Sequence, residues 1–329
     1  MEVRVEMIVL KRDGRAVSFD HEKISSALQR ANQELPLDKN IGESWEVSSH
    51  KNGMSIVENG ELEGQTLENL LKEYKEKLVG KAVYEKYGDN FPLLIKYLDV
   101  NDRLSVQVHP SDEYALRVEG EFGKSESWYI IDASEDAKLI MGLADGVTKE
   151  KFQEKVSNKD FTDIFNVISV KKGDFINVNP GLVHASLEGS VVICETQQNS
   201  DTTYRIYDFD RIVDGEIREL HLDEAAEVIV YGEKPEISTE ESRMNIKVEG
   251  AKVQELIRGE YFSIDKLNID GLYRDKVCSN FTVLSIMDGE ARIICNGKEY
   301  TIVKGDTYFI PAELEIEIMG KVEILKSFM

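Results

Sequence analysis

KGDFINVNPGLVH, residues 172–184, consists of a turn, a short apolar run, a second turn and a histidine. Gly173 belongs to the first turn and Pro180-Gly181 form the second, because glycine and proline favour the backbone angles that tight turns require. The mostly apolar residues between the turns are typical of a buried strand. The stretch therefore predicts a β-strand whose closing turn presents His184.

A similar pattern lies near the end of the chain. KGDTY precedes Pro311 as KGDFI precedes Pro180, and this repeat predicts two related barrels. His184 follows the first proline, whereas Glu315 stands at the same offset from the second. We therefore expect only the first barrel to hold a metal ion.

Most of the remaining chain also has the pattern of strands. Short apolar segments separated by Gly, Asp and Asn predict a sandwich or barrel; they include residues 129–132, 167–170, 191–195, 283–287 and 291–295. Helices are expected over residues 67–78, with Thr66 as N-cap, over 148–156 and over 223–230. The predicted fold is mainly β, a double barrel with a few covering helices.

Length, composition and charge limit the domain number, the classes of binding partner and the cellular location. A chain of 329 residues, 41% of them hydrophobic, can build two domains with their own cores. The net charge of −22 argues against nucleic-acid and anionic-membrane partners, which need a basic surface. The charged N-terminal residues lack a signal-peptide core, and no apolar run approaches the roughly 18 residues of a membrane span. Cys194, Cys278 and Cys295 lack paired spacing, so we expect reduced thiols in a soluble, cytoplasmic protein. The oligomeric state stays open.

Residues with metal-binding chemistry lie in two further segments. In LSVQVHP, the side chains of Ser105, Gln107 and His109 share one face of a strand, while the residues between them face the other way. In GKSESWY, Lys124 and Glu126 share a face in the same manner.

A barrel that joins these faces would offer two imidazoles, a carboxylate and an amide oxygen to one ion; the residues are Gln107, His109, Glu126 and His184. This donor set suits one Zn²⁺ per chain, with a water or substrate oxygen completing the shell. With neutral histidines the centre keeps a positive charge, which favours a developing oxyanion.

Several segments follow one another in an order shared with a known family. They are GESWEVS at 42–48, FPLLIK at 91–96, LSVQVHP at 104–110, GKSESWY at 123–129 and ETQQNSDTTYR at 195–205. Residues 173–184 also resemble the second cupin motif, and from about residue 36 the chain resembles the type I mannose-6-phosphate isomerases. The likeness is weak in the C-terminal barrel.

This resemblance implies a cupin (jelly-roll) double barrel and a zinc-dependent enzyme that interconverts mannose 6-phosphate and fructose 6-phosphate through an enediol. It implies that the four residues named above bind zinc. The implied catalytic residues are Arg205, Lys124 and Asp201, and Ser105 and His50 are expected to contact the substrate.

The roles within this set remain partly open. Arg205 is expected to contact either the enediolate or the phosphate. Lys124 could transfer a proton or act as a charge partner for phosphate or carboxylate, and Asp201 could orient Arg205. No general base is assigned.

The N-terminus departs from the family, whose members begin with a strand and a Trp-Gly-Gly segment. Residues 7–34 instead resemble part of an ATP-cone, a nucleotide-binding regulatory module, but too little of it is present to expect nucleotide binding. Alternating apolar residues are expected to replace the missing edge strand: Val3, Val5, Met7 and Val9. The expected domains are an atypical segment at 1–35, a metal-binding cupin domain at 36–236 and a metal-free cupin domain at 237–329.

Two other functions remain open from the sequence. The altered N-terminus would be compatible with a non-catalytic cupin that binds sugar phosphates. A site of two histidines and one carboxylate would also suit an iron-dependent cupin oxygenase. The presence of both Lys124 and Arg205 favours isomerisation over oxygenase chemistry.

Overall fold

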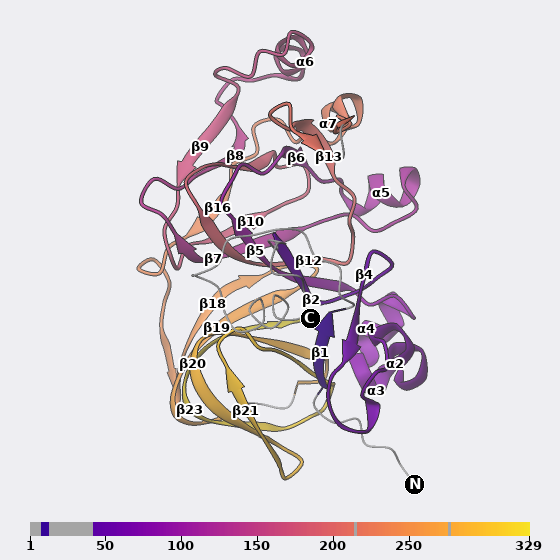
Figure 1. The fold of residues 1–329 in the computed structure, drawn as a ribbon, viewed down its shortest axis with the longest axis vertical. Coiled ribbons are helices and arrows are strands. Elements are labelled where there is room, and N and C mark those ends of the chain that lie inside the picture. The colour runs from indigo at the N-terminus through magenta and orange to yellow at the C-terminus, as the bar shows by residue number, and fades with distance from the viewer. Residues whose placement is uncertain (1–7, 13–41, 214–215, 276–277) are drawn as a thin grey trace. The chain divides into compact units, whose positions relative to one another are not determined.

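The computed structural model describes residues 8–12, 42–213, 216–275 and 278–329. Strands dominate and helices are few (Figure 1), which confirms the predicted mainly β fold. The described chain divides into two compact units. One spans residues 98–240, and the other combines the residues before 98 with 241–329.

The unit of residues 98–240 contains two sheets. The first includes the order β16-β10-β7-β12-β5, with bounds Glu236–Ser238, Phe175–Val178, Glu126–Ala133, Val191–Gln198 and Leu93–Val100; residues 93–97 of β5 belong to the other unit. The second has the order β13-β6-β11-β8-β9, with bounds Tyr204–Tyr207, Val106–Val108, His184–Glu188, Lys138–Leu143 and Phe165–Ser169. β7 runs antiparallel to both β10 and β12, which are distant from it in the chain. Pairing between strands that are distant in the sequence is typical of a jelly roll.

Apolar residues of both sheets form the core between them. One buried cluster joins Trp128 and Ile193 of the first sheet with Leu139 of the second. On the other face of the second sheet, Val106 packs in a cluster with Phe152 of a covering helix. Because side chains alternate along a strand, Gln107 on β6 faces away from this outer cluster.

Helices α6 and α7 cover that outer face. α6, Lys149–Ser157, begins after Thr148, whose side chain accepts a hydrogen bond from the Lys151 amide at 3.3 Å. α7 spans Leu222–Val228 and buries two alanines in the same cluster. The predicted covering helices near these positions are therefore confirmed. α5, Asp112–Val118, was not predicted, because only Ala115 of its seven residues is buried and no apolar stripe marks it.

The other unit is built on a sheet of long strands. Its order is β17-β18-β19-β23-β20-β22-β1-β4-β3, with β21 paired to β20. In that order the bounds are Ile246–Val248, Ala251–Arg258, Ser263–Arg274, Ile316–Phe328, Thr282–Cys295, Thr307–Ile310, Ile8–Arg12, Gly53–Val57 and Ser49–His50; β21 is Lys298–Val303 and β2 is Glu43–Val47. Residues 283–287 and 291–295, predicted as two strands, are parts of β20, whose pairing with β23 shifts register between Ile286 and Asp288. An apolar cluster from β19, β20, β22 and β23 fills the interior.

Two short helices replace the long helix predicted over residues 67–78, and a third follows them. α2, Leu67–Tyr74, starts after Thr66, which accepts a hydrogen bond from the Asn69 amide as predicted. The helix ends at Lys75, whose φ of 52° is left-handed, and α3 (Glu76–Val79) and α4 (Lys81–Tyr87) follow. Gly80, with a φ of 94°, separates these two helices. The position requires glycine because a Cβ atom there would lie 2.4 Å from the Ser279 carbonyl oxygen.

β1 lies between β22 and β4 and pairs antiparallel with both. It includes Val9 of the expected edge strand, whereas residues 1–7 and most of the ATP-cone-like segment lie outside the described residues. The expected boundary at 236/237 is close to the unit boundary at 240/241, but residues 42–97 group with the C-terminal strands. The assignment of domains stays a prediction.

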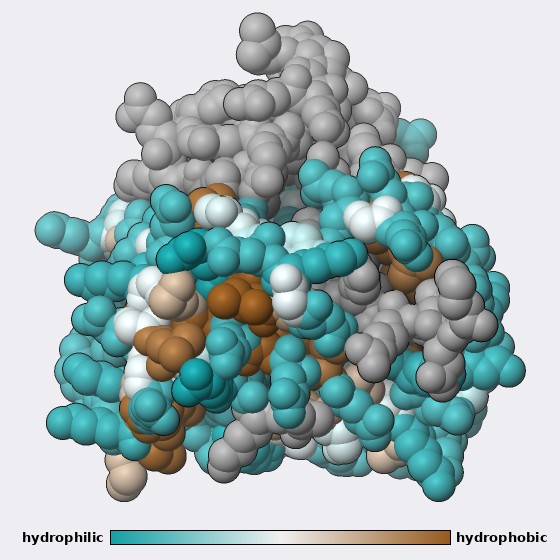
Figure 2. All heavy atoms as spheres, turned by 90° about the horizontal axis from the view of Figure 1, so that it is seen from below, coloured by the Kyte–Doolittle hydropathy of each residue, from teal (hydrophilic) through white to brown (hydrophobic). Residues whose placement is uncertain are grey.

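Hydrophilic residues cover most of the face drawn in Figure 2, with a smaller apolar area among them. This is in keeping with a chain in which 31% of the residues are charged. Among the described residues, no helix has both the length and the apolar character that a bilayer crossing requires.

Candidate metal centre

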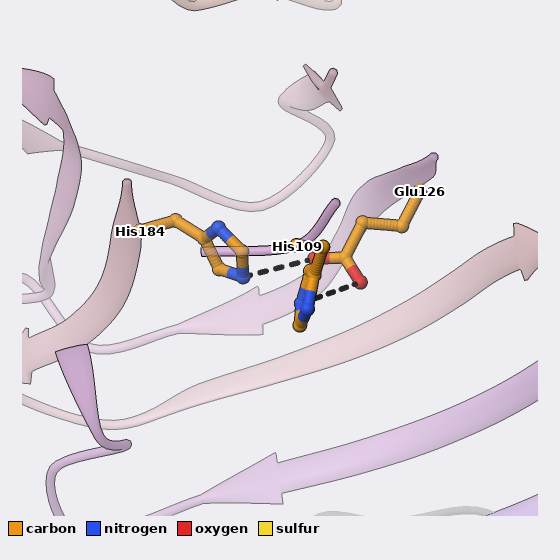
Figure 3. Close-up of side chains that lie close together, drawn as sticks. All are labelled: His109, Glu126 and His184. Carbon is orange, nitrogen blue, oxygen red and sulfur yellow. Dashed lines mark ion pairs between the residues drawn. The ribbon is translucent and has the colours of Figure 1, made fainter. Parts of the chain in front are cut away.

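Three of the four predicted ligands meet inside the unit of residues 98–240. His109 follows β6, Glu126 begins β7 and His184 begins β11, and Figure 3 shows their side chains pointing toward one another. His109 Nε2 lies 3.5 Å from Glu126 Oε2, and His184 Nε2 lies 3.2 Å from Glu126 Oε1. One donor atom from each of the three lies within 4.8 Å of the others, and all three residues are buried.

Strand register brings further predicted residues to the same face. His184 on β11 stands directly opposite Gln107 on β6, and Gln107 stands opposite Arg205 on β13. Directly opposed residues in antiparallel strands project to the same side of the sheet. Gln107 and Arg205 therefore share the inner face with His184. Ser105 is two residues before Gln107, and its hydroxyl donates a long 3.5 Å hydrogen bond to Gln107 Oε1.

Backbone contacts fix which nitrogen of each imidazole is available. His109 Nδ1 lies 3.0 Å from the Thr202 carbonyl oxygen, and His184 Nδ1 lies 2.9 Å from that of Leu182. A carbonyl oxygen only accepts, so each Nδ1 must carry the proton. In the neutral rings, both Nε2 lone pairs then face the Glu126 carboxylate.

Burial favours the neutral form of His184. Its side chain is fully buried, and desolvation lowers its pKa, although the negative charge of Glu126 acts in the opposite direction. Two lone pairs and a carboxylate around one point are all electron donors, so the arrangement suits a cation. Two imidazoles and one carboxylate are ligands that Zn²⁺ and several other divalent metals accept.

Two residues that were not predicted support this cluster. The Trp128 ring meets the His184 ring edge-on, at 5.4 Å between centroids. The Trp128 Nε1–H donates to Glu195 Oε2 at 3.0 Å, and the two residues are cross-strand partners. Both lie within quoted sequence segments, but a buried pair of this kind has no signal in the sequence beyond alternation along a strand.

Lys124 brings the nearest positive charge. Its Nζ lies 3.1 Å from Glu126 Oε2, and the residue is only 5% exposed. The Lys124 amide also donates to the Pro110 carbonyl oxygen at 3.0 Å, which anchors this segment beside His109. The lysine therefore lies beside the carboxylate of Glu126, as its spacing predicted.

Backbone hydrogen bonds to His221 fix the position of Arg205. Its amide donates to His221 Nδ1 at 3.2 Å, and the His221 amide donates back to the Arg205 carbonyl oxygen at 2.8 Å. Burial lowers the pKa of Arg205 most, the positive charge of Arg218 lowers it further, and Asp208 and Asp201 raise it. His221 and Asp208 were not predicted, because nothing in their spacing relates them to Arg205.

Two predicted residues are not part of the buried cluster. Asp201 is exposed, and its charge acts on Arg205. His50 lies in the other compact unit, where its Nδ1 accepts from the Asn52 amide at 3.2 Å and its ring is 5.8 Å from that of Trp45. The roles predicted for both residues stay predictions.

Comparison with known proteins matches this arrangement to one family. The model of the phosphomannose isomerase type I catalytic domain matches residues 20–153, and that of the mannose-6-phosphate isomerase cupin domain matches residues 252–329. The probable mannose-6-phosphate isomerase GmuF of Bacillus subtilis is 40% identical over 296 residues, covering 89% of this chain and 90% of that protein. The mannose-6-phosphate isomerase of Streptococcus mutans is 37% identical over 312 residues, covering 93% and 95%.

Solved structures agree. The crystal structure of the Bacillus subtilis mannose 6-phosphate isomerase matches with a TM-score of 0.85 at 32% identity, covering 99% of this chain and all of that one. A structure from Archaeoglobus fulgidus matches at 21% identity with a TM-score of 0.73, which supports the fold alone. The cupin fold predicted from the sequence is thus confirmed, and the chain belongs to the type I mannose-6-phosphate isomerase family of aldose–ketose isomerases.

Proposed function

We propose that this mannose-6-phosphate isomerase depends on zinc and interconverts mannose 6-phosphate and fructose 6-phosphate through an enediol. The buried cluster of His109, Glu126 and His184, beside Lys124, carries the proposal. Gln107 would be the fourth protein ligand, from the position opposite His184. When bound, zinc would act as a Lewis acid that polarises the substrate oxygens.

The chain's own residues would perform the remaining tasks. The reaction moves a proton between two adjacent carbons, so negative charge must be stabilised on oxygen while a residue handles the proton. Lys124 is buried beside Glu126 and is proposed to hold or transfer a proton near that carboxylate. Arg205, whose pKa is lowered but whose guanidinium keeps its charge, is proposed as the fixed cation for substrate. Asp201 is proposed to orient Arg205, and Ser105 and His50 to contact the substrate.

A coupled assay with mannose 6-phosphate tests the proposal. Turnover should disappear after chelation and return with zinc. Absent turnover in the zinc-loaded protein, combined with stabilisation of the fold by mannose 6-phosphate, would favour a non-catalytic binder. Oxygen consumption by an iron-loaded form, without isomerisation, would favour the oxygenase.

A cytoplasmic location is also part of this proposal. None of the three cysteines, all within the described residues, forms a disulfide. Reduced thiols of this kind are usual in a reducing compartment.

A further inference from the structure

A second arginine lies beside Arg205 and has no role in the proposal above. Arg218 follows the small hairpin of β14 (Ile212–Val213) and β15 (Glu216–Ile217). Its Nη1 atom lies 3.5 Å from Asp208 Oδ2, and a third of its side chain is exposed. Its charge acts on Arg205, and the carboxylate of Asp208 acts on both arginines.

Asp208 is the buried carboxylate that acts on both arginines. It is 2% exposed, and neither of its carboxylate oxygens has a hydrogen-bond partner within the described residues. Arg205 Nε is likewise buried without such a partner in that part of the chain. Buried polar groups normally have hydrogen-bond partners. The oxygens of Asp208 need donors, which the two arginines can supply, whereas the Arg205 Nε–H needs an acceptor from a further group.

The charges indicate what kind of group this is. Two guanidiniums close together repel each other, and one buried carboxylate compensates only one of them. Asp201, the other carboxylate that acts on Arg205, is exposed and therefore screened by solvent. An anion between the arginines would relieve the repulsion, and guanidinium groups bind phosphate oxygens with two parallel hydrogen bonds.

The position agrees with the shape of the substrate. In a hexose 6-phosphate the phosphate is at the opposite end of the carbon chain from the two carbons that react. A phosphate-binding group should therefore lie apart from the metal ligands and nearer to solvent. Arg205 stands opposite Gln107 on the inner face, whereas Arg218 is partly exposed.

We propose that Arg218 binds the phosphate group of the substrate, and that Asp208 is the positioning residue that holds Arg218 beside Arg205. This assignment rests on the proposed function for the identity of the sugar phosphate. In this assignment the phosphate end of the substrate lies at Arg218 and the reacting end at Glu126 and Lys124.

Steady-state kinetics of Arg218→Ala tests the assignment. KM for mannose 6-phosphate should rise about tenfold or more while kcat falls less than about threefold, because binding remote from the reacting carbons is lost. Inhibition by inorganic phosphate should weaken in parallel, and Arg218→Lys should be intermediate because it keeps the charge without the planar fork. The matched control is Arg117→Ala, since Arg117 packs over the Tyr114 ring at 5.2 Å and should leave all constants unchanged. KM and phosphate inhibition within about twofold of wild type in Arg218→Ala would overturn the proposal.

A double-mutant cycle tests the role of Asp208. If Asp208 acts through Arg218, Arg218→Ala should raise KM much less in an Asp208→Asn background than in the wild type. Equal effects in both backgrounds would remove Asp208 from the assignment.

A failure of the isomerase proposal can be distinguished from a failure here. If the zinc-loaded wild type does not turn over mannose 6-phosphate, calorimetry with inorganic phosphate still applies. Loss of phosphate binding in Arg218→Ala would then support the arginine site, and equal binding by both proteins would reject it.

Discussion

The two KGD turns, at residues 172–174 and 304–306, have the same hydrogen bonds but precede segments of different kinds. The amides of Gly173 and Gly305 each donate at 2.8 Å to a carbonyl of a neighbouring strand. Asp174 and Asp306 each accept a hydrogen bond from the backbone amide three residues earlier, at 2.9 and 3.0 Å. The repeat inferred from the sequence is therefore a repeat of structure.

Beyond the turns, the two copies diverge. The first leads to His184, which is fully buried in the candidate metal centre, and the second leads to Glu315, which is exposed. The unit that contains residues 241–329, called the C-terminal unit below, also has a buried polar cluster, but the opposite charges of its residues pair with each other. Lys326 Nζ lies 2.7 and 2.6 Å from the two carboxylate oxygens of Asp275, which also accepts from the Tyr273 hydroxyl at 3.0 Å.

The presence of a cation within the cluster distinguishes the structural pair from the candidate metal centre. Lys326 supplies a cation to the carboxylate of Asp275, so that cluster is complete without a ligand. In the unit of residues 98–240 the imidazole lone pairs and the carboxylate of Glu126 face one another, and Lys124 Nζ lies 3.1 Å from one oxygen of that carboxylate. The first cluster gathers the donor atoms of a candidate cation site, whereas the second contains its own cation.

Replacing His184 and Glu315, the residues at matching positions of the two copies, by alanine should give the largest difference in metal content and activity. His184→Ala should lower bound zinc and isomerase activity together, by about 100-fold or more in activity, because a ligand is lost outright. Metal analysis and the coupled assay would measure both. Glu315→Ala, at the matching position, should change neither. Near-full metal content and rate in His184→Ala would remove His184 from the centre.

Arg205→Ala should separate catalysis from metal binding. The cation that stabilises charge on the substrate would be lost while all three clustered donors remain, so turnover should fall about 100-fold or more with metal content retained. Parallel metal analysis and kinetics on the purified variant would show this. An unchanged rate would contradict the role proposed for Arg205.

The sequence predicted the parts of the site that depend on alternation and turns. Ser105, Gln107 and His109 follow a period of two, and turn residues mark the start of His184's strand. Asp208 and His221 lie outside the strands, and no period relates them to Arg205 on β13. The division of residues 67–78 into α2 and α3 was missed for a related reason, since the positive φ of Lys75 is not indicated by its residue type.

The Lys326–Asp275 pair offers the converse test in the C-terminal unit. Both side chains are 8% exposed, so Lys326→Met should leave an uncompensated buried carboxylate and lower the free energy of unfolding by about 3 kcal/mol. Denaturant titration of the whole chain would measure this, and zinc content at low temperature should stay unchanged. Lys304→Met is the matched control, because the side chains of Lys304 and its partner Asp288 are 43% and 70% exposed. A loss below about 1 kcal/mol would show that the pair is not the closed structural cluster inferred here.

The smallest effect should come from the turns themselves, where the two copies are most alike. Gly173 and Gly305 have φ angles of 88° and 90°, and alanine at either position would place a Cβ atom in a disfavoured backbone region. Each Gly→Ala substitution should therefore lower the free energy of unfolding by about 1–2 kcal/mol. Thermal and denaturant unfolding of both variants, side by side, would measure the two losses. Because the hydrogen bonds of the two turns correspond one to one, the losses should be similar; a large loss at one glycine and none at the other would mean that the likeness of the turns does not extend to their energetics.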